Sequence, residues 1–258
     1  MNPVKYHEDD LPIEDLGTIG LAAGGQLLIN VDDLKALLSG RRTGLLELHD
    51  LETDNVKIKS INAKISLKTN EKGKIDLLIH PIYKNAEVPG LLTDTEARQL
   101  QKGEIGSLLR ITLDNNGKKK EMLVEYDPET KEFIVSDTDK ILAPDMVNNE
   151  FLTPTQKENY RKGKEVEIAD GTRFNYSGTD RHGIRSNKLA LVASALIDGG
   201  LSYLVYRGLN ALFNKKRDQN AAGKLSPGYY QALKDIENQH GFKRQEFEQY
   251  QATKERHR

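Results

Sequence analysis

The sequence predicts an α+β protein built from short modules, and three patterns lead to this prediction. Apolar and polar residues alternate between Gly44 and Ile82, as in half-buried β-strands. Two segments begin with Leu-Thr and continue to Lys-Gly, as capped helices do, and residues 183–213 are mainly apolar. In order, we expect a small helical module, antiparallel strand and hairpin modules with two short Thr-capped helices, a long apolar helix and a charged helical tail.

The composition favours several small modules over one large core. Of the 258 residues, 37% are hydrophobic and 30% are charged, and there is no Trp. A single core of this size would be poorly supplied with apolar side chains. The formal net charge of -1 argues against a generally basic nucleic-acid-binding protein.

The chain has no cysteine, which excludes a disulfide scaffold, a thiolate metal site and a cysteine nucleophile. The first ten residues show neither the basic region nor the apolar region of a signal peptide. We therefore expect a cytoplasmic protein that is not secreted.

Residues 1–43 are predicted to form the small helical module. Its clearest helix runs from Asp32 to Gly40, where Leu34, Leu37 and Leu38 form one apolar face. Asp32 or Asp33 is suited to cap the first turn, and Gly40 the last.

Residues 44–182 are predicted to form α+β modules. Strands on either side of Asn70-Glu71-Lys72-Gly73 make one hairpin, and strands 123–127 and 132–137 flank the turn Pro128-Glu129-Thr130-Lys131.

An internal repeat lies in this region, at about 91–113 and 151–169. Leu92-Thr93 matches Leu152-Thr153, and Lys102-Gly103 matches Lys162-Gly163 at an offset of sixty residues. In each copy we expect Thr to cap a helix that ends at Lys-Gly and leads into a strand. Two copies are too few for a solenoid, which usually needs at least three.

Residues 183–213 are predicted to form the apolar helix. Ala190, Ser194, Asp198 and Ser202 recur every four residues and would make a small, polar stripe for docking or self-association. Insertion of 189–213 into a membrane, or attachment at its surface, is the alternative, although Asp198 would oppose insertion.

Residues 214–258 are predicted to be a basic linker followed by a charged tail that is helical or disordered. Ser226-Pro227-Gly228 opens a helix there, with Tyr229, Leu233 and Ile236 on one side.

No local motif indicates catalysis. The six histidines are scattered singly, the Gly-rich stretch 20–25 lacks the ending of a phosphate-binding loop, and no Gly-x-Ser-x-Gly elbow occurs. The sequence therefore predicts no catalytic, cofactor-binding or metal site and no small-molecule substrate.

Basic residues near the apolar segment are candidates for contacts with phosphate or anionic lipid. They are Arg181, Arg185, Lys215, Lys216 and Arg217.

Three blocks carry a resemblance to known families: residues 32–43, residues 63–67 through 80–82, and residues 152–164. Together they resemble uncharacterised families of the Bacteroidetes, the domain of unknown function 4099 at the N-terminus and the domain of unknown function 3945 after it. The block 184–203 is similar to a recurring signature of such proteins. The resemblance implies no activity, and it associates the second domain with DNA-processing proteins of mobile elements.

These observations lead to three hypotheses about function. The first is a non-enzymatic interaction or accessory protein, with a protein partner or self-association. The second is a membrane-attached accessory factor, and the third is a nucleic-acid accessory domain.

Overall fold

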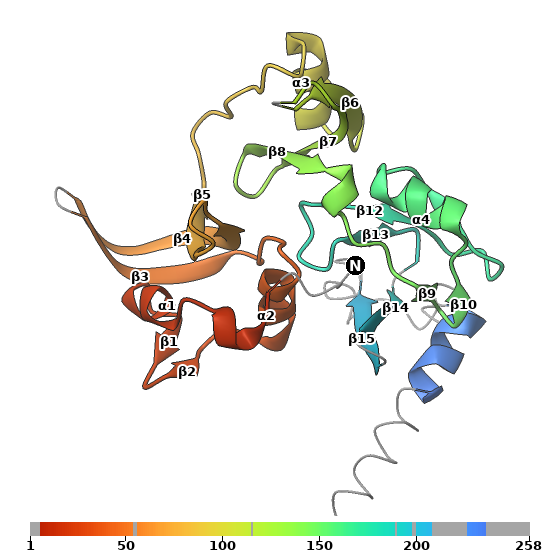
Figure 1. Ribbon diagram of the computed structural model, residues 1–258, viewed down its shortest axis with the longest axis horizontal. Coiled ribbons are helices and arrows are strands. Elements are labelled where there is room, and N and C mark those ends of the chain that lie inside the picture. The colour runs from red at the N-terminus through yellow and green to blue at the C-terminus, as the bar shows by residue number, and fades with distance from the viewer. Residues whose placement is uncertain are drawn as a thin grey trace, which may run out of the picture.

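The computed structural model describes residues 6–53, 56–114, 116–188, 190–197, 200–207 and 226–235. It confirms a mixed α+β protein whose sheets are antiparallel and whose helices are few and short (Figure 1).

The N-terminal segment covers one end of the first large sheet. It contains the 3-10 helix Glu8–Asp10, α1 (Ile13–Thr18) and a small hairpin of β1 (Ala22–Ala23) and β2 (Gln26–Leu27). Leu16 and Leu21 are buried in one hydrophobic core with Leu48 and Ile65 of that sheet. This apolar contact fixes the segment against the sheet.

Three units of the same design follow, each made of an eight-residue helix and a three-stranded antiparallel sheet. The first unit is α2 (Val31–Leu38) with β3 (Leu46–Thr53), β4 (Val56–Thr69) and β5 (Ile75–Pro81). The second is α3 (Asp94–Gln101) with β6 (Leu108–Leu113), β7 (Lys119–Asp127) and β8 (Glu132–Asp137). The third is α4 (Pro154–Arg161) with β11 (Val166–Glu167), β12 (Arg173–Tyr176) and β13 (Ile184–Ser186).

In every unit the helix packs on the central strand of its own sheet. α2 contacts β4, α3 contacts β7 and α4 contacts β12. Figure 1 shows the three units as separate groups around the middle of the molecule, the first in red and orange, the second in olive and green, and the third in teal.

The three helices share one sequence frame. The residue before each helix accepts a hydrogen bond from the backbone N–H three positions on: Asn30 in the first unit, Thr93 in the second and Thr153 in the third. Seven positions after the cap lies a buried residue, and ten positions after it a glycine with φ of 69° to 71°. These residues are Leu37, Leu100 and Tyr160, then Gly40, Gly103 and Gly163.

The predicted Thr caps and Lys-Gly endings are thus confirmed, and the structure adds a third copy that the sequence did not reveal. One detail of the prediction was wrong: Asn30, not Asp32 or Asp33, caps α2. Asp33 is buried and accepts a hydrogen bond from the backbone N–H of Gly44 instead.

The prediction of a long apolar helix over 183–213 was wrong. The described residues there form β13, β14 (Ala190–Ile197) and β15 (Gly200–Arg207). β14 and β15 pair antiparallel in a four-stranded sheet with β9 (Met146–Val147) and β10 (Glu150–Phe151), which follow the 3-10 helix Thr138–Lys140. The run is apolar because it pairs and packs within the protein: Leu191 and Ala193 belong to the core of the third unit.

The described part of the C-terminal region is a helix over 227–235, which begins where the sequence predicts. Tyr229 and Leu233 pack with Ala190 and Val192 of β14. The linker at 214–225, Ile236 and the charged tail to 258 lie outside the described residues, so their predicted structure stays a prediction.

Candidate functional site

The site begins with the two faces of β4. Ala63, Ile65 and Leu67 point into the core of the first unit, so Lys64 and Ser66 lie on the opposite face. On a lone sheet this face would be solvated. Here the end of β7 and the β7–β8 turn, both of the second unit, contact it, and so does the β12–β13 loop of the third unit.

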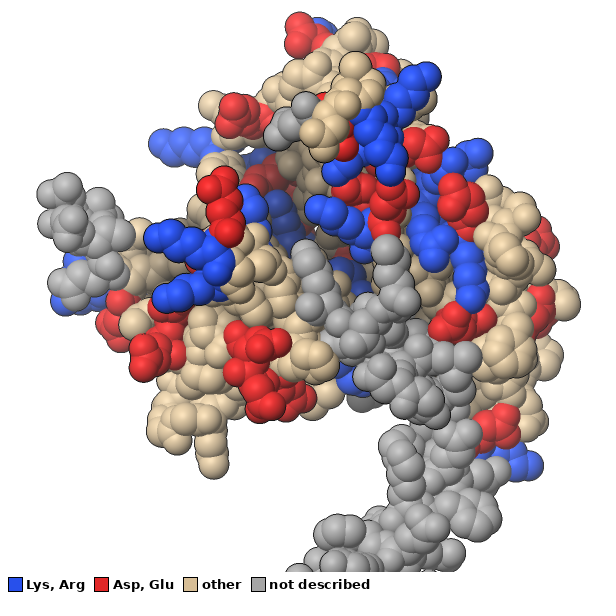
Figure 2. Space-filling view, in the orientation of Figure 1, with Lys and Arg blue, Asp and Glu red and all other residues tan. Residues whose placement is uncertain are grey.

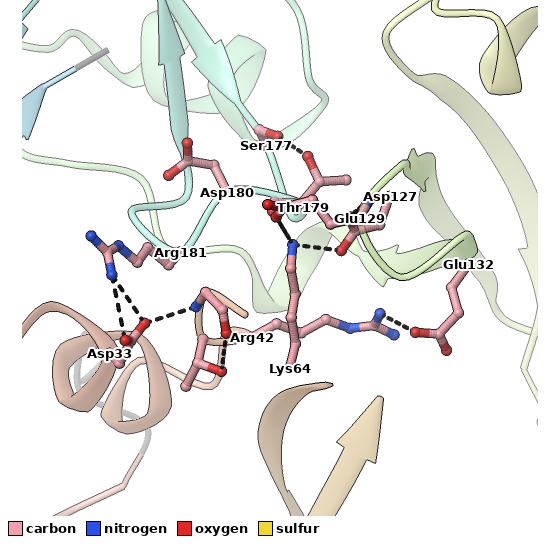
Figure 3. A network of polar contacts seen from close by, with 12 residues as sticks. Asp33, Arg42, Lys64, Asp127, Glu129, Glu132, Ser177, Thr179, Asp180 and Arg181 are labelled. Atoms are coloured by element: carbon pink, nitrogen blue, oxygen red, sulfur yellow. Dashed lines mark hydrogen bonds and ion pairs between the residues drawn. The ribbon is translucent and has the colours of Figure 1, made fainter. Parts of the chain in front are cut away.

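Lys64 contacts both of the other units. Its ammonium lies 2.7 Å from Asp127 Oδ2 and 2.8 Å from Glu129 Oε2, and it donates to the Thr179 carbonyl oxygen at 3.1 Å (Figure 3). The side chains of Lys64 and Asp127 are each only 1% exposed. Since an ammonium has three N–H donors, these acceptors satisfy it completely.

A second set of contacts joins the first unit to the second. Arg42 Nη1 lies 2.6 Å from Glu132 Oε2, and His80 Nδ1 lies 3.5 Å from the same oxygen. His80 Nε2 is 2.8 Å from Ser66 Oγ. Burial, together with the positive charge of Arg42, lowers the pKa of His80 to about 4, so the imidazole is neutral near pH 7.

The Ser66–His80–Glu132 order has the connectivity of a nucleophile, a base and an orienting carboxylate. Two observations favour a structural role. The cavity beside Lys64 is lined by neither Ser66 nor His80. The lowered pKa of His80 also makes the imidazole a weak acceptor for a hydroxyl proton.

The β12–β13 loop of the third unit contacts both of the other units. Arg181 Nη1 lies 3.4 Å from Asp33 Oδ2, and the Arg181 carbonyl accepts from Arg41 Nε at 3.0 Å. The backbone N–H of Gly178 donates to Glu125 Oε2 at 2.6 Å. Burial raises the pKa of Glu125, and the Gly178 N–H and the charge of Arg185 act against that rise.

We call these contacts the junction, meaning the contacts among the three units around Lys64. It comprises Asp33, Arg41, Arg42, Lys64, Ser66, His80, Glu125, Asp127, Glu129, Glu132, Gly178, Thr179 and Arg181.

A cavity of about 360 Å³ opens beside the junction. It brings together two of the predicted basic residues, Arg181 and Arg185, with His182 and Lys64. Arg185 Nη2 donates to Thr179 Oγ1 at 2.6 Å. The other predicted basic residues, Lys215, Lys216 and Arg217, lie outside the described residues.

Carboxylates balance the charges of this cavity. Asp127, Glu129 and Asp180 line it beside the two arginines and Lys64. On the face drawn in Figure 2, basic and acidic side chains are interspersed. The arrangement gives no concentrated positive field of the kind that attracts phosphate backbones.

The predicted docking stripe is not formed. Ala190 and Ser194 are buried in β14, and Ser202 is the register partner of Ala195 in β15. Asp198 lies outside the described residues. The four positions therefore lack the helical spacing on which the prediction depended.

Within the described part of the chain, no cluster of three or more His, Asp or Glu side chains is arranged to hold a metal ion. Nor does any helix there have the length and apolar character needed to cross a bilayer.

Sequence reasoning missed Lys64, Asp127 and Glu129, the centre of the junction. The signal available was the alternation Ala63-Lys64-Ile65-Ser66-Leu67, which places Lys64 on the face opposite the core. Its partners are 63 or more residues away in the chain, so no local pattern identifies them.

Comparison with known families gives one match. The family described as "Protein of unknown function (DUF4099)" matches residues 6–89. This confirms the N-terminal resemblance, and the matched region contains the N-terminal segment and the whole first unit, ending before α3. The resemblance of the following residues to the domain of unknown function 3945, and the origin in the Bacteroidetes, stay predictions.

No curated protein matches the chain, and no solved structure matches it either.

Proposed function

We propose that the protein is a non-enzymatic interaction scaffold whose three units act together as one binding platform. The observation that carries the proposal is the junction at Lys64, where one buried ammonium contacts carboxylates of the second unit and a carbonyl of the third.

The physical reason is that a buried ion pair fixes an arrangement. If the units separated or docked differently, Lys64 or Asp127 would lose its partner, and an unpaired charge in the interior costs several kcal/mol. The units are thereby held in one relative orientation. Surfaces that lie on different units keep a constant geometry, as a partner spanning them requires.

The repeated design supports the same proposal. Proteins built from stacked repeats offer extended surfaces to partners. Here three helix-and-sheet units follow one another, and a turn or loop of each later unit contacts a side chain of the first.

The test uses the full chain as bait in chemical crosslinking in its native cells. Wild type should recover a discrete set of proteins, and Lys64→Ala should recover markedly less of them because the platform is loosened. Lys68→Ala, an exposed lysine on the same strand, is the matched control and should behave as wild type. The proposal is wrong if wild type recovers nothing above an unrelated bait, or if Lys64→Ala recovers the same set equally well.

A second candidate function is that of an accessory domain in DNA processing that binds the nucleic-acid backbone. The observation that favours it is that Arg181 and Arg185 line the same cavity. It predicts binding to labelled DNA that weakens with salt and weakens further in Arg185→Ser. DNA binding that does not depend on the salt concentration, or the absence of DNA binding, would rule out this candidate. The carboxylates in the same cavity make it the weaker of the two.

A further inference from the structure

β6 is an edge strand of the second unit. The sheet order is β6-β7-β8, so β7 pairs with one side of β6 and no described strand pairs with the other. An edge strand offers unpaired backbone groups that can accept another strand.

The hairpin geometry shows which backbone groups face outward. Asp114 N–H donates to the Lys118 carbonyl, so the residues at even positions of β6, such as Thr112, bond to β7. Because hydrogen bonds alternate along an antiparallel pair, the N–H and C=O groups of Leu109, Ile111 and Leu113 point away from β7. The Leu109 carbonyl accepts from Arg110 Nη1, whereas no described group bonds to the backbone of Ile111 or Leu113 on this side.

The first strands of the other two units are treated differently. In β3, the N–H of His49 donates to the Ile19 carbonyl of the N-terminal segment at 3.1 Å. In β11, the Glu167 carbonyl accepts from Gln156 Nε2 at 3.0 Å. Equivalent edges are therefore bonded within the chain in the first and third units and open at Ile111 and Leu113 in the second.

The open edge is also apolar. Ile111 is 62% exposed and Leu113 is 68% exposed, and both lie on the sheet face of Leu109, which packs against the core of the third unit. Edge strands are usually protected by lysine, proline or a covering segment. The outer half of β6 has none of these, so it is suited to receive a strand.

The sequence of β6 is self-complementary. Leu109, Ile111 and Leu113 form an apolar pattern that is symmetric about Ile111. Antiparallel pairing with a second copy, centred on Ile111, places Ile111 opposite Ile111 and Leu109 opposite Leu113. The outward groups of Ile111 and Leu113 then meet partners, and the Leu109 carbonyl, which already accepts from Arg110 Nη1, accepts a second bond with its other lone pair. The pairing gives about six hydrogen bonds, two for each directly bonded pair.

Charge also favours this orientation. Lys118 lies in the turn after β6, and Lys119 and Lys120 begin β7 next to it. Antiparallel pairing puts the two lysine tips at opposite ends of the shared sheet, whereas parallel pairing would bring them together and repel. A two-fold interface of this kind is closed and stops at two copies.

We propose that the protein forms a homodimer through β6, antiparallel and centred on Ile111, so that two three-stranded sheets become one six-stranded sheet. The inference deepens the proposed function by naming one partner of the scaffold, a second copy of the chain, and in that respect rests on it.

Sedimentation equilibrium of the full chain, from low to high micromolar concentration, tests the dimer. Wild type should show a reversible monomer–dimer equilibrium, and Ile111→Lys should weaken it at least about tenfold by placing a charge at the centre of the interface. Val31→Lys is the control, because Val31 is also exposed, at 65%, but lies on α2. Circular dichroism verifies that each variant is folded.

The chain's lack of cysteine allows a test of the register. Ile111→Cys should give a disulfide-linked dimer under mild oxidation, because directly paired residues lie about 5.5 Å apart at Cα, within the range of a disulfide. Leu113→Cys should not, because its two copies lie four residues apart along the strand, about 13 Å.

The inference is overturned if wild type stays monomeric, if Ile111→Lys dimerises as wild type does, or if Leu113→Cys crosslinks as readily as Ile111→Cys. A monomer that still recovers partners in the crosslinking experiment leaves the scaffold standing and removes only the dimer. A dimer that recovers no other protein leaves the edge pairing standing and removes the scaffold.

Discussion

At the scale of single residues, Lys64 is the centre of the junction. Its charge is satisfied by two carboxylates and a carbonyl in a setting where Lys64 and Asp127 are almost fully removed from water. The attraction within such a pair largely offsets the cost of burying it, so the net contribution to stability is small. Removing only one partner, in contrast, is strongly destabilising, because it leaves the other charge buried and unpaired.

Lys64→Ala is therefore expected to lower the free energy of unfolding by about 3 to 5 kcal/mol, because Asp127 is left as a buried, unpaired carboxylate. Lys68→Ala, on the same strand but exposed, should change it by less than about 0.5 kcal/mol. Urea unfolding followed by circular dichroism measures both. Equal effects of the two variants would show that Lys64 is not buried against the other units.

His80 gives the junction a dependence on pH. Its pKa is near 6.5 in the unfolded chain and about 4 in the folded protein, where burial and Arg42 disfavour the charged ring. The unfolded state thus binds more protons between these values. The contribution of His80 to the free energy of unfolding is fully present above about pH 6.5 and is lost as the pH falls toward 4.

Between pH 7 and pH 5 this group should remove about 2 kcal/mol of stability. His80→Gln replaces the ring with an amide that cannot titrate. The loss of stability between pH 7 and pH 5 should therefore be smaller in this variant by a similar amount. Urea unfolding of wild type and variant at the two pH values gives the comparison. If both proteins lose the same stability, His80 is not held neutral by the fold.

At the scale of the elements, the same helix ending lies in two different environments in the second and third units. Gly103 and Gly163 both have φ of 69°, a region that favours glycine. A Cβ at Gly103 would meet no atom within 4 Å, whereas a Cβ at Gly163 would lie 2.8 Å from Leu123 Cδ1 and 2.9 Å from Ser107 Oγ. The C-terminal end of α3 is thus open to solvent, whereas that of α4 lies against the second unit.

Gly103→Ala is expected to cost about 1 to 2 kcal/mol, from the backbone conformation alone. Gly163→Ala should cost about 1 to 3 kcal/mol more, because the methyl group also displaces Leu123 or Ser107. Parallel urea unfolding of the two variants gives the difference directly. Equal losses would mean that the third unit does not approach the second at this point.

Elements defined by local chemistry were predictable from the sequence. The caps at Thr93 and Thr153, the helix endings at Gly103 and Gly163, and the strands from β4 to β8 all depend on residues within a few positions of one another. The copy of the frame in the first unit was missed, because its cap is Asn30 instead of Thr and its glycine follows Ser39 instead of Lys. The residue types differ, although the cap side chain accepts a hydrogen bond from the backbone N–H three positions on in every unit.

The apolar run at 190–207 was misread for a physical reason. β14 is buried at Leu191 and Val192, whose adjacent side chains point to opposite faces, so the strand shows no alternation of apolar and polar residues. A run of this kind cannot be told from a buried helix by periodicity. The usable signal was Asp198-Gly199, a dipeptide typical of two-residue hairpin turns, between the register partners Ile197 and Gly200.

At the scale of the whole molecule, three units of one design are joined by contacts that the design itself does not specify. The helix-and-sheet frame recurs in each unit, while Lys64, Asp127 and the β12–β13 loop belong to one unit each. Their meeting depends on the relative placement of segments far apart in sequence. This explains why the elements were largely predictable and the junction was not.

Lys64 of the first unit and Asp127 of the second are coupled across the junction, and a double-mutant cycle of Lys64→Ala and Asp127→Ala tests this coupling most directly. Urea unfolding of the four proteins gives the coupling energy. The double variant should be more stable than the sum of the single losses predicts, by roughly 1 to 3 kcal/mol, because each single variant leaves a buried charge unpaired and the double variant does not. Losses that simply add would show that the two residues do not interact, and the account of a locked three-unit platform would be wrong.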